Sequence, residues 1–370
     1  MSPPLQQPLS SIPAEVMCAQ DYELLAPRFM ALPTFEYIAG GSAAGITTAA
    51  NREAFARWSV LPRILRDVSQ GHTRLTLAGS ALQHPILLAP VAFQTLAHPA
   101  GEVDSARAAR ALDTTIVSST LSSFSLEDIG RAAGGAHWFQ LYFQASRGAT
   151  LALLRRAEAA GCGAIVVTLD AVIQAPGQRA LRAGFHMPAD CVAVNLTVAE
   201  EAPQPLADGD SRIFQGLMRG APNWDDLAWL LAQTRLPVWV KGVLHPDDAV
   251  RALSLGAVGI VVSNHGGRGL DGAPASLDAL PLVRAAVGKT APLLFDGGIR
   301  SGADIFKAIA LGADAVMVGR LQVYALSVAG ALGVAHMLKC LREEFELCMA
   351  LAGCASLADI DGATLWRKQT

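Results

Sequence analysis

Short runs of β-branched and other apolar residues recur along the chain from about residue 85 onward, and a stretch rich in Ala and Leu with helical periodicity follows each run. This alternation is typical of a parallel sheet whose strands are connected by helices. The runs number eight, the strand count of a TIM (β/α)₈ barrel, and 370 residues exceed the roughly 250 that one barrel needs. A doubly wound open sheet would show the same alternation, so the count favours the barrel without excluding the open sheet. The eight runs are Pro85–Val91, Thr114–Ser119, His137–Phe143, Gly163–Ala171, Pro237–Val243, Gly259–Gly266, Pro292–Gly298 and Ala315–Arg320.

Four segments fall outside this repeat. Residues 1–14 are rich in Pro, Gln and Ser, which predicts a flexible tail ahead of a single domain over 15–370. Residues 20–80 are expected to form helices and a small hairpin that cover one end of the barrel. Residues 186–223 follow the fourth strand and carry several Pro and Gly residues, so we expect a long loop there that acts as a lid. The stretch Val328–Leu351 is expected to form a closing helix.

Composition limits the classes of partner. Hydrophobic residues make up 52% of the chain and charged residues 16%, which is enough for a sizeable core with apolar surface left for subunit contacts. The net charge of −3 and the scattered Lys and Arg residues argue against a nucleic-acid partner. We find no signal-peptide pattern, no apolar run long enough for a membrane span, no C-x-x-C pair and no zinc-ligand spacing. The sequence therefore predicts a soluble cytoplasmic protein with reduced cysteines, no membrane span and no metal site.

Glycines and arginines follow the last two predicted strands. The string DGGIRSG (residues 296–302) comes after the seventh strand, and Gly319 and Arg320 come after the eighth. In barrels these two loops and a helix N-terminus commonly form a phosphate site, because glycines let backbone N–H groups approach an anion. Arg300 and Arg320 could grip that anion. Alternatively the glycines only form turns and the arginines pair with surface carboxylates, and the pattern does not distinguish FMN from a phosphorylated substrate.

The string SNHGGRGLDG (residues 263–272) puts a histidine at the end of the sixth strand and an arginine three residues later. His265 can take a proton near neutral pH and Arg268 can hold a carboxylate beside it, which suits a hydroxy acid. The other seven histidines are interpreted as structural. Asp170, at the end of the fourth strand, could orient His265 and stabilise its protonated form, or it could simply cap a helix.

Three further polar residues lie where the predicted strands or the N-terminal cover meet the site. Lys241 ends the fifth strand, where a buried charge must be paired or used, and the N1–C2=O edge of a reduced flavin would account for it. Tyr37 and Tyr142 could donate hydrogen bonds to a substrate, although tyrosines are commonly core residues.

Taken together, five strings carry a specific resemblance over Tyr37 to Cys354: SNHGGR with LDGAPAS, DGGIRSG, ALGADAV with GR, WFQLY, and LAP with AHP and GE. They resemble the family of FMN-dependent α-hydroxy acid oxidases and dehydrogenases, which includes glycolate oxidase, lactate oxidase, mandelate dehydrogenase and hydroxymandelate oxidase. The resemblance implies a TIM-type barrel, FMN as the cofactor, a small α-hydroxy acid as the substrate, O₂ or another electron acceptor, and a homotetramer or larger assembly.

The resemblance also implies a role for individual positions. His265 matches the family's base, Asp170 the carboxylate behind it and Arg268 the arginine that binds the substrate carboxylate. Tyr37 and Tyr142 match active-site tyrosines, and Lys241 matches the lysine beside flavin N1. The ribityl and phosphate contacts fall at Asp296, Gly298, Arg300, Gly319 and Arg320, and the isoalloxazine contacts fall at Pro90, Val91, Ala92, Ser118, Gln140, Thr168 and Ser263.

The chain departs from the family pattern after the fourth strand. The family usually carries a second active-site arginine there, and this chain has Gly177 within IQAPGQRALR. Arg179 or Arg182 could compensate if the loop shifts. Thr120 stands where the family often has a larger aromatic residue, and Phe93 stands beside the flavin wall. A roomier, more apolar pocket would suit a bulky or aryl substrate of the L or (S) form, with reduced activity on short acids such as glycolate.

The sequence thus predicts oxidation of an α-hydroxy acid to the α-keto acid. Two alternatives stay open. One is a non-redox FMN-dependent isomerase resembling the type 2 isopentenyl diphosphate family, which would need a further basic site. The other is a flavin-binding member whose activity is lost or altered because the second arginine is replaced at Gly177.

Overall fold

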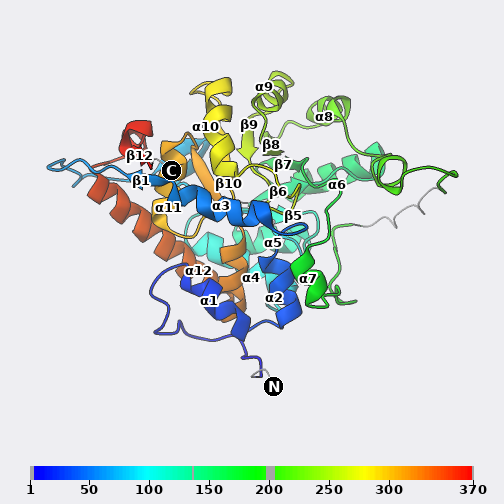
Figure 1. Ribbon diagram of the computed structural model, residues 1–370, viewed down its shortest axis with the longest axis horizontal. Coiled ribbons are helices and arrows are strands. Elements are labelled where there is room, and N and C mark those ends of the chain that lie inside the picture. Colours follow the sequence, from blue (N-terminus) through cyan, green and yellow to red (C-terminus); the bar gives the residue numbers. More distant parts are fainter. Residues whose placement is uncertain (1–3, 136, 197–204, 369–370) are drawn as a thin grey trace.

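The computed structural model describes residues 4–135, 137–196 and 205–368, and within them eight parallel strands close into a barrel (Figure 1). Each strand lies inside one of the eight predicted runs, so the barrel is confirmed and the open sheet is excluded. The strands are shorter than the runs because the runs include the turns at their ends. The strands are β4 (Ile86–Leu88), β5 (Ile116–Ser119), β6 (His137–Leu141), β7 (Ile165–Thr168), β8 (Val238–Val243), β9 (Gly259–Val262), β10 (Leu293–Asp296) and β11 (Ala315–Val318), and β11 pairs with β4 to close the ring.

Alternation along the strands divides the apolar side chains between two layers. Leu87, Val166 and Leu294 belong to the cluster inside the barrel, whereas the flanking Ile86 and Leu88 pack with the helices outside it. Side chains that alternate across a strand necessarily sort in this way. Leu77 and Leu82 from the hairpin of β2 (Leu75–Leu77) and β3 (Ser80–Leu82) join the interior cluster and close its N-terminal end. The C-terminal ends of the strands are left for polar residues.

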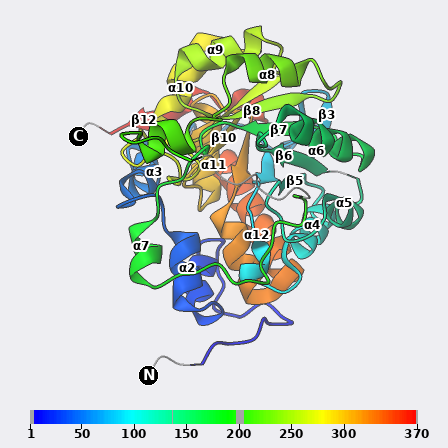
Figure 2. The ribbon, with the colours of Figure 1, turned by 90° about the vertical axis from the view of Figure 1, so that its right-hand side faces the viewer.

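Helices surround the barrel and follow the strands in the expected order (Figure 2). Several begin at a side-chain cap: Ser125, Ser146, Asn223 and Ser301 each accept a backbone N–H of the first turn. Such caps satisfy N–H groups that have no partner within the helix. The helices are α4 (Gly101–Ala111), α5 (Leu126–Ala133), α6 (Arg147–Ala159), α7 (Gln178–Arg182), α8 (Trp224–Leu231), α9 (Pro246–Ser254), α10 (Ser276–Val287), α11 (Gly302–Ala310) and α12 (Arg320–Ala352), with short turns η2 (Gln94–Leu96), η4 (Leu357–Asp359) and η5 (Gly362–Thr364).

The N-terminal residues form the predicted helices and hairpin. Figure 2 shows α2 beside α7 and α12, on one side of the barrel. In the segment predicted to be a flexible tail, the backbone N–H groups of Gln6 and Leu9 donate to the carbonyls of Arg28 and Val328. Its flexibility stays a prediction. The elements are α1 (Asp21–Leu25), η1 (Ala26–Arg28), α2 (Leu32–Ala39), α3 (Ile46–Ala56), the hairpin β2–β3, and β1 (Trp58–Val60), which pairs with β12 (Leu365–Arg367).

The closing helix begins earlier than the sequence predicts and is not one straight rod. α12 starts directly after the eighth strand, and Ala329 and Gly330 have non-helical backbone angles inside it. Gly330 has a φ of +54°, in the left-handed region, so this break favours glycine. By length and composition α12 could cross a membrane, but 78% of its most apolar window is buried in the fold, as in core helices of soluble proteins.

The long segment after β7 contains α7 and a single π-helical turn, η3 (Arg212–Leu217). Figure 1 shows part of it reaching away from the barrel. Residues 197–204 lie outside the described residues. The described residues of 186–223 do not line the central cavity, so their action as a lid stays a prediction.

Candidate active site

A cavity opens at the C-terminal ends of the barrel strands and encloses about 1160 Å³, open solvent at its mouth included. Thirteen of the residues selected from the sequence line it. They come from different strands because the barrel brings the strand ends together at one face. They are Tyr37, Pro90, Val91, Ala92, Tyr142, Lys241, His265, Arg268, Asp296, Gly298, Arg300, Gly319 and Arg320.

His265 and Asp170 form a hydrogen-bonded pair at this cavity. Nδ1 of His265 lies 2.9 Å from Oδ1 of Asp170, and both side chains are largely buried, at 17% and 13% exposed. Burial would raise the pKa of the Asp170 carboxyl, but the charges of His265 and Lys241 outweigh burial and hold that pKa below its usual value. An ionised Asp170 fixes the ring so that Nε2 is the nitrogen left for other partners. The nearest of these is the Tyr142 hydroxyl, at 3.5 Å.

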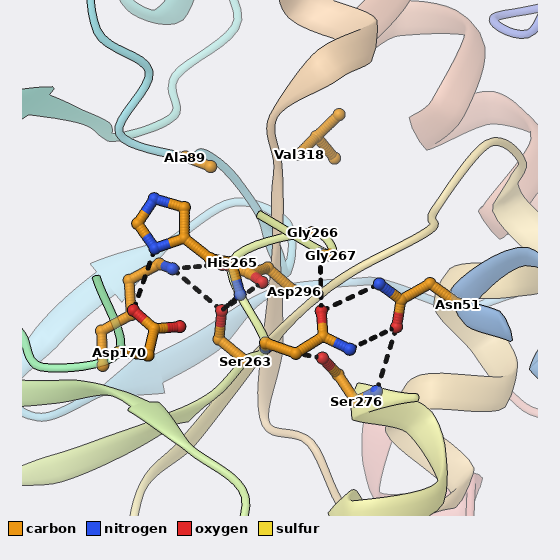
Figure 3. A network of polar contacts seen from close by, with 12 residues as sticks. Asn51, Ala89, Asp170, Ser263, His265, Gly266, Gly267, Ser276, Asp296 and Val318 are labelled. Atoms are coloured by element: carbon orange, nitrogen blue, oxygen red, sulfur yellow. Dashed lines mark hydrogen bonds and ion pairs between the residues drawn. The ribbon is translucent and has the colours of Figure 1, made fainter. Parts of the chain in front are cut away.

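The backbone at His265 is held in an uncommon conformation. Its φ of +59° lies in the left-handed region, which costs free energy for a residue other than glycine. The hydroxyl of Ser263 accepts the His265 backbone N–H at 3.0 Å, and Asn264 Oδ1 accepts the N–H of Gly267 at 3.1 Å (Figure 3). These contacts hold the turn that directs the imidazole into the cavity.

A buried amide pair supports this turn from behind, and sequence analysis missed it. Asn51 and Asn264 exchange two side-chain hydrogen bonds of 2.8 Å, although 213 residues separate them. Oδ1 of Asn51 also accepts the backbone N–H of Ser276 at 3.1 Å (Figure 3). The string SNHGG contains Asn264, but nothing near Asn51 in the sequence indicates its partner.

Gly242 makes room for the carboxylate of Asp170. It has a φ of +96°, and a Cβ on it would lie 2.5 Å from the Asp170 carboxyl carbon. The second oxygen of Asp170, Oδ2, is buried and has no hydrogen-bond partner among the described residues. The strand residue after Lys241 therefore has a structural reason to be glycine, which the sequence alone did not reveal.

Arg268 and Tyr37 pack together in the wall of the cavity. The Arg268 guanidinium lies 4.9 Å from the centre of the Tyr37 ring, and Phe185 stacks on that ring at 4.2 Å. Arg268 Nη1 donates to the Tyr37 carbonyl at 2.8 Å. This leaves guanidinium donors that could bind an anion, as expected for a carboxylate-binding arginine. Burial raises the pKa of Tyr142, so its hydroxyl stays a proton donor.

Lys241 is fully inside the fold and is paired. Its Nζ donates to the Ser263 hydroxyl at 2.8 Å and lies 3.2 Å from the Asp296 carboxylate. Burial would lower the pKa of Lys241, but Asp296 and Asp170 outweigh burial and raise it, so the ammonium stays charged. A charged donor thus lines the cavity one strand away from His265.

The two arginines predicted to bind phosphate have different surroundings. Arg320 donates to the backbone carbonyls of Ile38, Gly40 and Gly266 at 2.6–2.9 Å, and no carboxylate pairs with it among the described residues. Burial lowers its pKa to about 10, so it is still a cation at neutral pH. Arg300 instead pairs with Glu23. Among the described residues, Arg300 therefore pairs with a carboxylate and Arg320 does not. The Arg300–Glu23 pair is not a surface pair, because Arg300 is only 8% exposed.

Gln140 and Thr168, near the strand ends, each have a buried polar group without a partner in the part of the chain that the structure describes. The Gln140 carbonyl oxygen Oε1 accepts the backbone N–H of Thr120 at 3.2 Å, which orients its amide and leaves Nε2 unpaired. The Thr168 hydroxyl is unpaired as well, and Thr168 lies in register with Lys241. An unpaired buried donor costs free energy, so each of these groups would be stabilised by a polar partner.

The structure corrects three expectations about the cavity wall. Ser119 lines the cavity, whereas Ser118 donates to the Trp138 carbonyl, because successive strand residues face opposite ways. Thr120 is fully buried, and Leu121 takes its expected place on the wall. Arg179 and Arg182 do not compensate for Gly177, since they bond to Glu36 and Gln178 outside the cavity.

Gly177 itself is held against the N-terminal cover. The backbone N–H of Ala43 donates to the Pro176 carbonyl at 3.2 Å, and that of Gln178 donates to the Ala43 carbonyl at 2.9 Å. A Cβ on Gly177 would lie 2.5 Å from the Gly41 carbonyl oxygen. The loop therefore could not carry a side chain at this position without moving, and Gln174 is the residue of this loop that lines the cavity.

Comparisons with known proteins agree with this geometry. A family model described as FMN-dependent dehydrogenase matches residues 26–367. The chain is 64% identical to an L-lactate oxidase of Alicycliphilus denitrificans, over 97% of this chain and 98% of that one. It is 44% identical to a 4-hydroxymandelate oxidase of Amycolatopsis orientalis, over 91% and 94%. A crystal structure of mandelate oxidase with (S)-2-phenylpropionate superposes with a TM-score of 0.85 at 42% identity, covering 95% of this chain and 98% of that one.

Proposed function

The chain belongs to the family of FMN-dependent α-hydroxy acid oxidases and dehydrogenases, with FMN as its cofactor, and from this premise we propose that it oxidises an L-α-hydroxy acid with an apolar side chain to the α-keto acid. The observation that carries the proposal is that the His265–Asp170 pair and Arg268 share one cavity with a buried cation, Arg320. Base, carboxylate site and anion site are then within reach of one substrate and one cofactor.

The residues of this cavity fit FMN. The Lys241 ammonium lines the cavity, and the unpaired Gln140 Nε2 and Thr168 hydroxyl lie at neighbouring strand ends behind its lining; together they suit the hydrogen-bonding edge of an isoalloxazine ring. Pro90, Val91 and Ala92 would form the apolar wall beside the ring. The Ser263 hydroxyl accepts a hydrogen bond from Lys241 and donates one to Asp296 at 2.6 Å, so both residues belong to the hydrogen-bond network of Lys241. Gly298, Gly319, Arg300 and Arg320 would hold the phosphate, because glycine backbones and guanidinium groups bind anions well.

His265 would act as the base. Its Nδ1 is occupied by Asp170, so Nε2 can accept a proton from the substrate, and the ionised Asp170 stabilises the imidazolium that results. Arg268 would hold the substrate carboxylate, with the hydroxyls of Tyr37 and Tyr142 as additional donors. FMN, when bound, supplies the acceptor for the two electrons that leave the substrate. The position of His265 is compatible with removal of the hydroxyl proton or of the α-proton.

The substrate's side chain distinguishes two proposals. The relative with 64% identity over nearly its full length is named L-lactate oxidase, which supports L-lactate. The apolar wall of Phe93, Leu96 and Leu121, together with the likeness to mandelate oxidase, supports a bulkier or aryl acid such as (S)-mandelate. Because residue 177 is a glycine, Arg268 is the arginine that would bind the substrate carboxylate. We propose lactate as the principal substrate, with aryl acids accepted in the same cavity. Because several relatives are named oxidases, we propose O₂ as the electron acceptor.

We expect L-lactate and (S)-mandelate to bleach the flavin of the purified holoprotein without oxygen, and air to restore its colour. The measurement is anaerobic absorbance of the flavin over a panel of glycolate, L-lactate, D-lactate and (S)-mandelate. If no α-hydroxy acid reduces the flavin, the proposed reaction is refuted, although the family assignment is not. This is the result expected of an isomerase or of an inactive member of the family. Reduction without reoxidation by air would refute O₂ as the acceptor.

Asp170→Asn should lower the rate constant of flavin reduction by about 100-fold at every pH from about 5 to 9, since a lost ion pair of about 2.7 kcal/mol corresponds to that factor. The pKa of Asp170 is lowered, so its charge is present above its ordinary pKa and is lost only when the pH falls through the lower folded value. The wild-type carboxylate is therefore ionised over this whole range. Stopped-flow reduction at several pH values tests this, and a loss confined to one limb of the profile would contradict it.

We further propose a cytoplasmic protein that assembles as a homotetramer or a larger oligomer. None of the six cysteines, which all lie within the described residues, forms a disulfide, as is usual in the cytoplasm. For the assembly, Ile64 and Leu65 lie at an exposed loop with 83% and 99% of their surface open to solvent. Apolar side chains so exposed favour contact with another subunit. Light scattering of the holoprotein measures the assembly, and a monomer would refute it.

A further inference from the structure

Arg300 is anchored by a residue that lies far away in the sequence. Its Nε and Nη2 donate to the two carboxylate oxygens of Glu23 at 2.6 and 3.1 Å, across 277 residues. Its Nη1 donates to the carbonyl of Ile299 at 2.9 Å. A guanidinium has five N–H donors, so three are taken and two are left for a ligand. Glu23 does not line the cavity, whereas Arg300 does.

The helix that carries Glu23 is itself fixed to α12, which also contacts the first residue of α11. The Tyr22 hydroxyl lies 2.9 Å from Nδ1 of His336, and the Tyr22 side chain is completely buried. Glu344 of α12 accepts the backbone N–H of Ala19 at 3.4 Å and that of Gly302 at 2.8 Å. Two carboxylates thus connect the N-terminal segment to the glycine-rich loop 297–302.

The paired charges differ in their access to solvent. Arg300 is 8% exposed, while the Glu23 side chain is 31% exposed. Burial would raise the pKa of Glu23, but the hydrogen bond and charge of Arg300 lower it, so Glu23 is ionised at neutral pH. Solvent therefore screens the repulsion between Glu23 and a phosphate. The two hydrogen bonds to Glu23 hold the Arg300 side chain in one of its many rotamers. We expect the positioning effect to outweigh the repulsion.

We propose that Glu23 is a positioning residue for the phosphate of FMN. It binds one edge of the Arg300 guanidinium and so orients the two remaining N–H donors toward the phosphate. α1 is therefore part of the cofactor site rather than only a cover over the barrel. The inference rests on the proposed role of Arg300 in phosphate binding, and its test separates the two.

The test compares FMN with riboflavin, which carries the same ring without the phosphate. Apoprotein is titrated with each flavin and binding is followed by flavin fluorescence. For Glu23→Ala we expect the Kd for FMN to rise about 10-fold while the Kd for riboflavin changes less than about twofold. Glu23→Gln keeps one acceptor oxygen and should give a smaller rise. It also provides a second readout if the alanine variant folds poorly.

Glu15→Ala is the matched control, because Glu15 pairs with Arg28 on the same N-terminal segment and both side chains are 54% exposed. It should leave both affinities unchanged. Glu23→Ala combined with Arg300→Ala should bind FMN no more weakly than Arg300→Ala alone, since the effect of Glu23 passes through Arg300.

Three results would overturn the proposal. Tighter FMN binding by Glu23→Ala would mean that repulsion dominates. Equal loss of FMN and riboflavin would mean a general packing role. If the ratio of the Kd for FMN to the Kd for riboflavin is unchanged in Glu23→Ala but raised in Arg300→Ala, only the role of Glu23 is refuted. If Arg300→Ala leaves the ratio unchanged, the proposed phosphate role of Arg300 itself fails.

Discussion

His265→Ala is expected to lower the rate constant of flavin reduction by roughly 10²- to 10⁴-fold, the size of effect that a positioned general base produces. His265 is held for this task by Asp170 at 2.9 Å and by a turn that keeps its φ at +59°. The FMN should stay bound, because the groups proposed to hold the phosphate follow β10 and β11 whereas His265 follows β9. Stopped-flow absorbance with saturating L-lactate measures the rate, and the flavin content of the purified variant measures retention.

His72→Ala is the control for this variant, since His72 is an exposed histidine outside the cavity. It should reduce its flavin at the wild-type rate. Added imidazole should partly restore reduction in His265→Ala, because the missing group is a proton acceptor. A variant that keeps wild-type reduction, or one that is purified without FMN, would contradict the assignment of His265 as base.

Arg320→Met should weaken FMN binding by about 100-fold, since a buried charge-assisted contact to a phosphate is lost. At an FMN concentration about 100 times the wild-type Kd, FMN stabilises the wild type by about 2.7 kcal/mol, and this stabilisation should nearly vanish in the variant. The apoprotein should also lose some stability, because the carbonyls of Ile38, Gly40 and Gly266 lose their donor, but this loss is the same with and without FMN. Thermal unfolding with and without FMN measures both quantities.

Arg284→Met provides the matched comparison. Arg284 also donates to three backbone carbonyls, those of Gly312, Gly288 and Ala291, but it pairs with Asp314 at 2.9 Å as well and lies outside the cavity. Its replacement should lower the stability of apoprotein and holoprotein alike and leave the Kd for FMN unchanged. If Arg320→Met behaves in the same way, Arg320 serves the fold and the phosphate site must be sought elsewhere.

The parts of the site that the sequence predicted well are those encoded locally. A polar residue at the end of an apolar run, such as Lys241 or His265, can be recognised from the run itself, and closure of the barrel then brings such residues to one face. The facing of Ser118 and Ser119 could not be predicted in the same way. Both are serines at the end of one strand, and a single residue of register decides which of them reaches the cavity.

Partners that lie far apart in the sequence were beyond local reasoning. Nothing around Asn51 indicates Asn264, and nothing around Glu23 indicates Arg300, because these contacts exist only after the N-terminal segment packs against the barrel. The same holds for Arg179, which from the sequence could serve the substrate and in the structure pairs with Glu36. Its direction depends on how α7 packs against α2.

Hydrophobic periodicity and glycine positions are properties of short segments, so the amino-acid sequence was enough to predict the eight strands, their order and the polar residues at their ends. The packing of the fold instead sets which donors remain unpaired, which arginine has a carboxylate beside it, and why residues 177 and 242 are glycines. Those features depend on distances of a few ångströms between segments that the chain keeps hundreds of residues apart, and only the packed fold sets such distances.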